Sequence, residues 1–418
     1  MGNSKIKNGF VNFGKGCKNY FSAVGKCFKI KNFIAYIIIA AVTIIFGALS
    51  LTGGLNSSTQ ILLEKIAYNI ILAVSLSLVV GFLGELSLGH AGFMCLGAYI
   101  GGYMQKFVMT GLTTQAPFVS LILAMLIGGV VAAIFGFIIG LPALRLKGDY
   151  LAIVTLAFGE IVRCIFQNVE LFGGAIGMQT YHYNRDSLFI ICFIVAILTL
   201  VVINNFIKSK HGRAVMAIRD NEIAARAMGV NVTFYKLLVF IISAFFAGIA
   251  GVLFSNASSR INATASGIFD YNHSINILVM VVLGGMGSIN GSIIAATVIT
   301  YLNVKLQTIL TGDLAALKNL IYALILIALV IYNNAPKLKA FRTKYNLRNF
   351  IEKIKAWVLK LFSKKVKNNA GKEVEFGADW SKVPTKIDMD AVLSTEIIPD
   401  NSFVPDKPDK PAKEKGDK

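Results

Sequence analysis

The stretch that decides the fold is Pro117–Leu141, which reads PFVSLILAMLIGGVVAAIFGFIIGL and contains no charged side chain. A bilayer's hydrocarbon core is about 30 Å thick, and a helix rising about 1.5 Å per residue crosses it in about 20 residues. The stretch is therefore predicted to be a transmembrane helix. Eight further apolar runs are long enough to cross: Phe33–Leu51, Ile61–Leu83, Leu86–Phe107, Tyr150–Asn168, Leu188–Ile207, Phe234–Ser255, Ile275–Leu302 and Leu314–Tyr332.

The composition of the whole chain supports the same fold class. Of its 418 residues, 55% are hydrophobic and only 15% are charged, and the mean hydropathy is +0.66. A soluble domain typically carries about 25% charged residues, so an ordinary soluble protein is excluded. We predict an all-α integral membrane protein with about eight crossings plus a re-entrant or broken segment.

The charges gather at the two ends of the chain. Seven lysines and no acid precede Phe33, and 19 basic and 12 acidic residues follow Tyr332. The first apolar run starts too late and is too long for a cleaved signal peptide, so we expect it to be retained. The predicted segments are a basic N-terminal part (1–32), a transmembrane domain (33–333), a basic amphipathic part that is either an interfacial helix or a solvated tail (334–367), and a disordered C-terminal tail (368–418).

Lysines and arginines in the short loops predict the orientation, because the cytoplasmic side retains them. The basic loops are Arg145–Lys147 and Lys208–Arg226, and with both termini they should face the cytoplasm of a multi-pass protein of the cell (plasma or inner) membrane. Three more full crossings after the second loop would leave the basic C-terminus outside. We therefore expect the run after Tyr271 to enter and return on one side, with a break at Gly284–Ser288. A second break is expected at Gly84–Gly92.

The sequence carries no recognisable catalytic or metal-binding motif. It has no Gly-rich phosphate loop, no His-Glu-x-x-His and no nucleophile elbow. The four histidines share no short motif with a carboxylate, and the five cysteines are scattered. We expect no catalytic residue, no metal, no cofactor and no nucleic-acid partner, and a multi-pass membrane enzyme is disfavoured.

The most informative segment is the loop 208–232. Its small residues predict a short helix that ends at Gly229, a compact knob for another protein's groove; the alternative is an ordinary basic loop. Ala224-Ala225-x-x-x-Gly229 resembles the coupling-loop motif of importer permeases driven by ATP-binding-cassette (ABC) proteins, and its surroundings resemble the LivM-type permeases of branched-chain amino-acid importers. Three further segments are similar to that family: Ser87–Phe93, Leu144–Leu156 continuing to Arg163, and Val281–Ser288.

The resemblance runs from about Ile61 to Tyr332. It implies a permease without enzymatic activity, which pairs in membrane lipid with a second homologous permease subunit. It also implies two cytoplasmic ABC ATPases and an extracytoplasmic substrate-binding protein that delivers leucine, isoleucine or valine. Transport of urea or short amides, and a stand-alone secondary transporter, remain alternatives. The residues expected to contact the ATPase are Gly212, Arg213, Arg219, Glu222, Ala224, Ala225 and Gly229.

Glu160 and Arg163 are the charged candidates for the translocation path. They share a helical face, and Glu160 lies about 16 Å deeper than Asp149, near the bilayer midplane. A charge there costs at least ~2.5–3.5 kcal/mol unless it is paired or faces a cavity, so the pair either links helices or contacts substrate. Glu160 is the only acid that we expect deep in a span, which argues against ion coupling. His90 is expected to bond a carbonyl freed at a break. The full candidate set is Ser87, Gly89, His90, Glu160, Arg163, Gly284, Gly285 and Gly287.

Overall fold

The computed structural model describes residues 56–146, 148–183, 185–264 and 268–309, together with 323, 324 and 327. All of these belong to the unit Met1–Leu338, the first of two into which the chain divides. The segments predicted at 1–32, 334–367 and 368–418, and the span predicted at 33–51, lie outside the described residues. So does the span predicted at 314–332, except for the three isolated positions.

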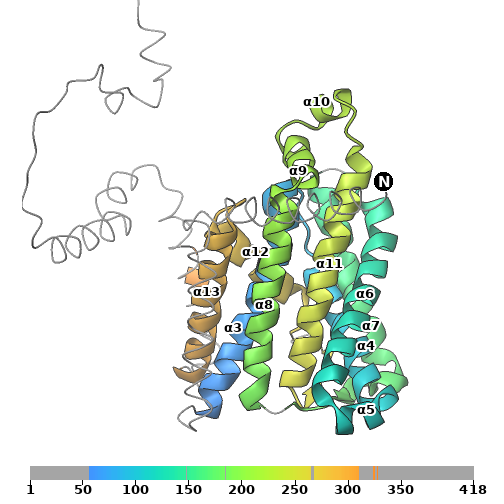
Figure 1. The fold of residues 1–418 in the computed structure, drawn as a ribbon, viewed down its shortest axis with the longest axis vertical. Helices are drawn as coiled ribbons and strands as arrows, with labels where there is room; N and C mark the ends of the chain where they lie inside the picture. Colours follow the sequence, from blue (N-terminus) through green and yellow to red (C-terminus); the bar gives the residue numbers. More distant parts are fainter. Residues whose placement is uncertain are drawn as a thin grey trace, which may run out of the picture. The chain divides into compact units, whose positions relative to one another are not determined.

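Five of the described helices are long and apolar enough to cross a membrane. This confirms a helical membrane protein, and Figure 1 shows these helices running side by side. They form because their apolar runs hold few charged side chains, and Pro117 starts one of them at a position where its missing N–H costs nothing. The five are α3 with η1 (Ser57–Ser77 and Leu78–Leu83), α6 (Pro117–Ala143), α8 (Arg185–Lys208), α11 (Val232–Ala257) and α13 (Ile289–Ile309).

Helix α3 is the centre of the packing. It is buried throughout its apolar stretch and contacts α8, α11, α12 and α13. Around it, α11 packs closely against α4 through glycines: a Cβ added to Gly97 would lie 2.1 Å from the carbonyl oxygen of Gly248, and one added to Gly251 would lie 2.0 Å from that of Met94. Such contacts need residues without side chains, as is common between membrane helices.

Two of the predicted spans are interrupted helices. The π-helix η1 ends at Gly84, which has φ +84°, and residues 84–89 are irregular before α4 (His90–Tyr103). The expected break is present but shorter than predicted, because Ala91 and Gly92 already belong to α4. The span predicted at 86–107 therefore starts later than expected, at His90, and α4 itself has 14 residues. Helix α4 runs without a gap into the π-helix η2 (Met104–Val108), so 90–108 is one continuous helix, and a bend at Met109 separates it from α5 (Thr110–Gln115).

The second interruption lies within the run predicted at 275–302. Helix α12 (Tyr271–Gly284) also has 14 residues. It ends at the break expected at 284–288, where Gly285 and Gly287 have φ values of +92° and +82°. Helix α13 then begins at Ile289. Positive φ values favour glycine because the Cβ of any other residue makes this conformation sterically unfavourable, which explains the glycines at this turn.

The remaining elements join the helices at the two ends of the bundle. Helix α7 (Asp149–Asn168) leads into η3 (Glu170–Phe172) and η4 (Gly174–Ile176). Strand β1 (Met178–Gln179) then pairs antiparallel with β2 (Arg260–Ile261), a two-residue ladder that the all-α prediction lacks. Helices α9 (Lys210–Asp220) and α10 (Glu222–Ala227) lie at one end, here called the α9–α10 end, and α5 lies at the other, the α5 end (Figure 1).

Candidate functional site

The loop 208–232 folds into two short capped helices. The Ser209 side chain accepts a hydrogen bond from the Gly212 N–H at 3.3 Å, which caps α9. The Asn221 side chain accepts from the Ala224 N–H at 3.0 Å, which caps α10. The turn after α10 contains Gly229 with φ +82°. Thus all seven residues predicted to contact an ATPase lie in α9, α10 or the turn that follows: Gly212, Arg213, Arg219, Glu222, Ala224, Ala225 and Gly229.

Helix α10 and the turn that follows it present apolar side chains to their surroundings. Ile223 and Met228 are 83% and 85% exposed, the largest values among the bulky apolar residues that the structure describes. Ala225 is buried and holds the helix against the rest of the protein. Both exposed side chains lie at the α9–α10 end, among the charged residues of the loop. Apolar surface rimmed by polar residues is typical of a protein contact site.

Arg219 of α9 links this loop to both helix breaks. Its guanidinium Nη1 donates to the carbonyl oxygen of Gly81 at 3.0 Å, within the π-helix η1. A Cβ added to Gly287, in the break after α12, would lie 3.4 Å from the same nitrogen. At the start of the first break, a Cβ added to Gly84 would lie 2.8 Å from Arg219 Cγ. The π-helix η1, which leads into that break, contacts the second break, because a Cβ added to Gly81 would lie 2.6 Å from the Gly287 nitrogen. Arg219 therefore lies beside both breaks.

A second link runs through Lys236, near the start of α11. Its ammonium donates to Glu85 Oε1 at 2.6 Å and to Glu222 Oε2 at 3.2 Å, and the other Glu222 oxygen accepts from Arg226 at 2.8 Å. The Lys236 side chain is only 6% exposed. These ion pairs connect α10, α11 and the break at 84–89. The sequence did not predict a role for Lys236 or Glu85. The available signal for Lys236 was that it is the single charged residue between positions 232 and 257.

The first turns of α4 and α12 meet inside the bundle. The Ala91 N–H donates to the Ser274 hydroxyl at 3.0 Å. Gly89 is required here, because a Cβ would lie 2.6 Å from the Thr155 carbonyl oxygen of α7. His90 lies 2.9 Å, Nε2 to Oγ, from the Ser75 hydroxyl of α3, whereas the sequence predicted a bond to a freed carbonyl. Its ring therefore joins α4 to α3 at this junction.

Glu160 and Arg163 of α7 bond each other, as their spacing predicts. Arg163 Nε donates to Glu160 Oε2 at 2.8 Å, and its Nη1 donates to the Ala263 carbonyl at 3.1 Å. The other Glu160 oxygen accepts from the Tyr271 N–H at 3.0 Å. The pair thus ties α7 to the first residue of α12 and to the irregular chain before it. The Glu160 carboxylate also remains partly exposed.

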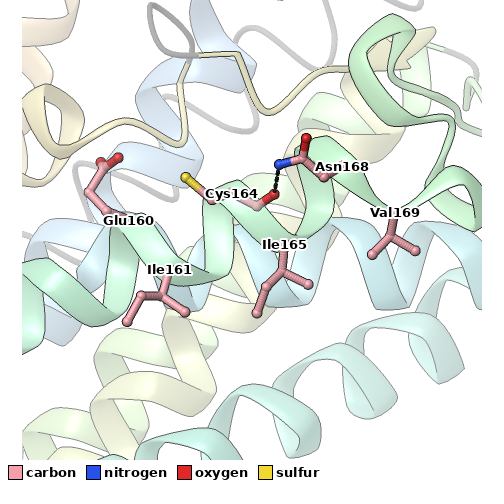
Figure 2. A pocket seen from close by; sticks show the side chains of 6 residues that line it. All are labelled: Glu160, Ile161, Cys164, Ile165, Asn168 and Val169. Atoms are coloured by element: carbon pink, nitrogen blue, oxygen red, sulfur yellow. Dashed lines mark hydrogen bonds between the residues drawn. The ribbon is translucent and has the colours of Figure 1, made fainter.

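A groove of about 580 Å³ runs along α7 beside this pair. Figure 2 shows Glu160 and Cys164 projecting to one side of the helix and Ile161, Ile165 and Val169 to the other. The polar lining residues Glu160, Cys164 and Asn168 recur every four residues, so they share one face. Polar groups facing hydrocarbon are costly, so this face is suited to water or another protein.

The remaining path candidates have packing and backbone roles. Ser87 is buried within the break at 84–89. Gly284 lets α12 approach α13, because a Cβ there would lie 2.5 Å from the backbone of Gly291. A Cβ on Gly285 would meet nothing within 4 Å, so that residue is needed for its φ alone. Among the described residues, no cluster of His, Cys, Asp and Glu could hold a metal ion.

One expectation about charge is wrong. Glu160 is not the only acid inside the described bundle, because Glu64 of α3 is 1% exposed. Glu64 lies seven residues after Ser57, where α3 begins, which is about 10 Å along the helix. The signal was an acid within the apolar run 61–83. Apart from Glu64 and Lys65 the run carries no charge, so it was predicted to be an ordinary transmembrane span.

Apolar crossing helices, two interrupted helices and buried ion pairs are together the features of a polytopic membrane transport protein. The chain belongs to the family of branched-chain amino acid transport system permease components, whose sequence model matches residues 58–330. It is of the LivM type within that family.

Three relatives illustrate the match. The chain is 36% identical to the high-affinity branched-chain amino acid transport system permease protein LivM of Salmonella typhimurium, over 55% of this chain and 59% of that protein. It is 28% identical to a probable branched-chain amino acid transport permease protein LivM of Methanocaldococcus jannaschii, over 56% and 76%. It is 25% identical to the permease protein LivH of Escherichia coli K12, over 55% and 78%. The match thus spans less than two thirds of the Salmonella protein, and no solved structure matches the chain.

Proposed function

We propose that this protein is a permease subunit of an ATP-driven ABC importer that moves leucine, isoleucine or valine across the cell membrane. The observation that carries the proposal is the double link from the loop 208–232 to the helix breaks, through Arg219 to Gly81 and through Lys236 to Glu85 and Glu222. Family membership and the names of the relatives support the substrate class.

The partners follow from the same family. A second permease of the LivH kind would complete the pore, since LivH proteins are themselves similar to this chain. Two cytoplasmic ATPases would bind α10 through Ile223 and Met228, and an extracytoplasmic binding protein would deliver substrate at the α5 end. In this topology the α9–α10 end and both termini are cytoplasmic, and 33–333 makes about eight crossings plus the broken segment. The flanking parts are 1–32, 334–367 and a disordered 368–418.

The geometry supports a simple coupling mechanism. An ATPase pair can bias the pore only by contacting its two states differently. A displacement of α10 would be carried by Glu222 and Lys236 to Glu85, and a displacement of α9 would be carried by Arg219 to Gly81. Both routes reach the chain that enters α4, whose first turn meets α12 at Ser274. Movement there would change the face of α7 that carries Glu160.

The test is whether the exposed apolar side chains of Ile223 and Met228 bind the ATPases. Ile223→Glu and Met228→Glu would place a charge in the docking surface, so we expect the ATPases to be lost from the purified complex and ATP-dependent leucine uptake to stop. Ile176→Glu is the matched control, because Ile176 is 72% exposed but lies in η4, near the β1–β2 ladder. Unchanged ATPase association in both α10 variants would contradict the proposal.

A further inference from the structure

A cluster of exposed cations lies where α8 passes into α9 (Figure 1). Lys208 is the last residue of α8, Lys210 and Arg213 belong to the first turn of α9, and all three side chains are exposed. Among the described residues, none of the three has an acidic partner. Farther along the same loop, by contrast, Arg219 and Arg226 each bond a carboxylate. The cluster is therefore positive charge that this part of the protein does not neutralise.

The stability of α9 does not explain these cations. The first turn of a helix favours acidic side chains, because the free N–H groups make that end positive. Helix α9 has no acid in its first turn and carries Lys210, His211 and Arg213 there instead. Like charges close together along the chain also repel one another. An anion bound among them would remove both penalties.

An apolar stripe on α8 leads to the cluster. Its members are 42–55% exposed and are Ile194, Leu198, Val201 and Val202. Spacings of three and four residues place them on one face of the helix, and Asn205 and Lys208 continue that spacing and are exposed too. No member of the stripe is polar, in contrast to the face of α7 that carries Glu160. This face of α8 is therefore suited to acyl chains.

The length of the stripe matches one leaflet of a bilayer. Leu198 lies ten residues before Lys208, which is about 15 Å along the helix. The hydrocarbon of one leaflet is also about 15 Å thick, half of about 30 Å. A lipid whose chains lie on the stripe would thus have its headgroup beside Lys208. Each cation near a membrane surface strengthens binding to anionic lipid about fivefold.

We propose that Lys208, Lys210 and Arg213 bind the headgroup of an anionic phospholipid, whose acyl chains lie along the α8 stripe. In the proposed topology this lipid belongs to the inner leaflet. The inference goes beyond the proposed function, because it depends neither on the solute nor on the source of energy. Helix α9 also carries Arg219, which bonds Gly81. The lipid would therefore fix the start of the helix that lies beside both breaks.

The experiment compares two lipids at one reporter. Leu198→Trp places a tryptophan in the stripe of the full chain, which is purified with its accompanying subunits and reconstituted in phosphatidylcholine. The fluorescence of the same complex without the reporter is subtracted. Brominated phosphatidylglycerol, which is anionic, and brominated phosphatidylcholine, which is zwitterionic, each quench a tryptophan that they contact. We expect phosphatidylglycerol to be preferred about 100-fold, from about fivefold for each of the three cations.

Charge variants assign the preference to the cluster. Lys208→Gln combined with Lys210→Gln should lower it about 25-fold, because two of the three cations are lost. The matched control combines Lys106→Gln with Lys305→Gln, which removes the same charge from η2 and α13 and should leave the preference unchanged. A second reporter, Leu126→Trp on the exposed face of α6, should be quenched equally by both lipids.

Four outcomes would overturn the proposal. Equal quenching of the Leu198→Trp reporter by both lipids would mean that the cluster does not select a headgroup, and quenching by neither would mean that another protein covers the stripe. A preference removed by inorganic phosphate, but not by chloride at the same ionic strength, would assign the cluster to a free anion. Loss of the ATPases from the Lys208→Gln and Lys210→Gln complex, with the lipid preference intact, would assign these cations to the ATPase contact. The assay uses neither ATP nor solute, so its result is independent of the proposed function.

Discussion

Lys236 offers the sharpest test of how the loop is coupled to the pore. In Lys236→Met the buried ammonium is removed, and Glu85 and Glu222 lose the cation that bridges them at 2.6 Å and 3.2 Å. Removing one partner of a buried ion pair costs about 3–5 kcal/mol. Both carboxylates are partly exposed and keep some water, so we expect the lower end of that range, about 3 kcal/mol, in stability.

The functional consequence is a loss of coupling. Hydrogen bonds to charged groups contribute about 1.5–3 kcal/mol each, and 1.4 kcal/mol corresponds to a factor of ten. We therefore expect the leucine carried per ATP hydrolysed to fall at least about tenfold in proteoliposomes. Arg226→Met is the control, because Arg226 is 67% exposed and its pair with Glu222 is worth only about 0.2–1 kcal/mol.

A double-mutant cycle completes the test. Once Lys236 is Met, Glu222→Gln should cost little further, since the bond that both substitutions remove is already gone. Strictly additive losses would mean that the two residues act independently. Wild-type uptake per ATP in Lys236→Met would refute the coupling route through α11.

Three further predictions concern η1, the turn after α10, and α7. Gly81→Ala should uncouple uptake from ATP hydrolysis, because its Cβ would lie 2.6 Å from the Gly287 nitrogen, whereas Gly111→Ala meets nothing within 4 Å and should transport normally. Gly229→Val should abolish substrate-stimulated ATP hydrolysis without preventing membrane insertion. Gly229 has φ +82°, and holding a residue other than glycine in this left-handed conformation costs about 1–3 kcal/mol. Gly229→Asn should keep more activity, and equal stimulation in Gly229→Val would count against this turn. Glu160→Gln should lower the free energy of unfolding by about 1.5–3 kcal/mol, because the charged hydrogen bond to Arg163 is lost, and the yield of purified protein should fall with it. Full yield without uptake would instead assign the carboxylate to transport.

The described spans and the positions of both breaks could be predicted from the sequence. Apolar runs of about 20 residues have few other stable states, and clustered glycines interrupt helices. The extent of the first interruption could not be predicted, because Ala91 and Gly92 are small residues like Gly84 and Gly89 but already belong to a helix. Helix α7 was predicted in full, and so was its internal pair of Glu160 with Arg163, because both depend on local spacing.

The contacts between distant segments were beyond sequence reasoning. Lys236 and Glu85 are 151 positions apart, and Arg219 and Gly81 are 138 apart. Nothing in either neighbourhood specifies the other, and a lone lysine near a helix start reads as an interfacial anchor. The burial of Glu64 could not be predicted either, because nothing in the run 61–83 shows which helices pack around it. Tertiary packing alone assigns these residues their partners.

The glycine contacts between α4 and α11 limit where the molecule can change shape. Where backbone meets backbone at Gly97 and Gly251, no side chain lies between α4 and α11 that could reorient to absorb a displacement. We therefore expect the two helices to move together during a transport cycle, with the change of shape taken up at the glycine turns and at α7. Spectroscopic distance labels on α4 and α11 should report a constant separation, whereas labels on α7 and α12 should not.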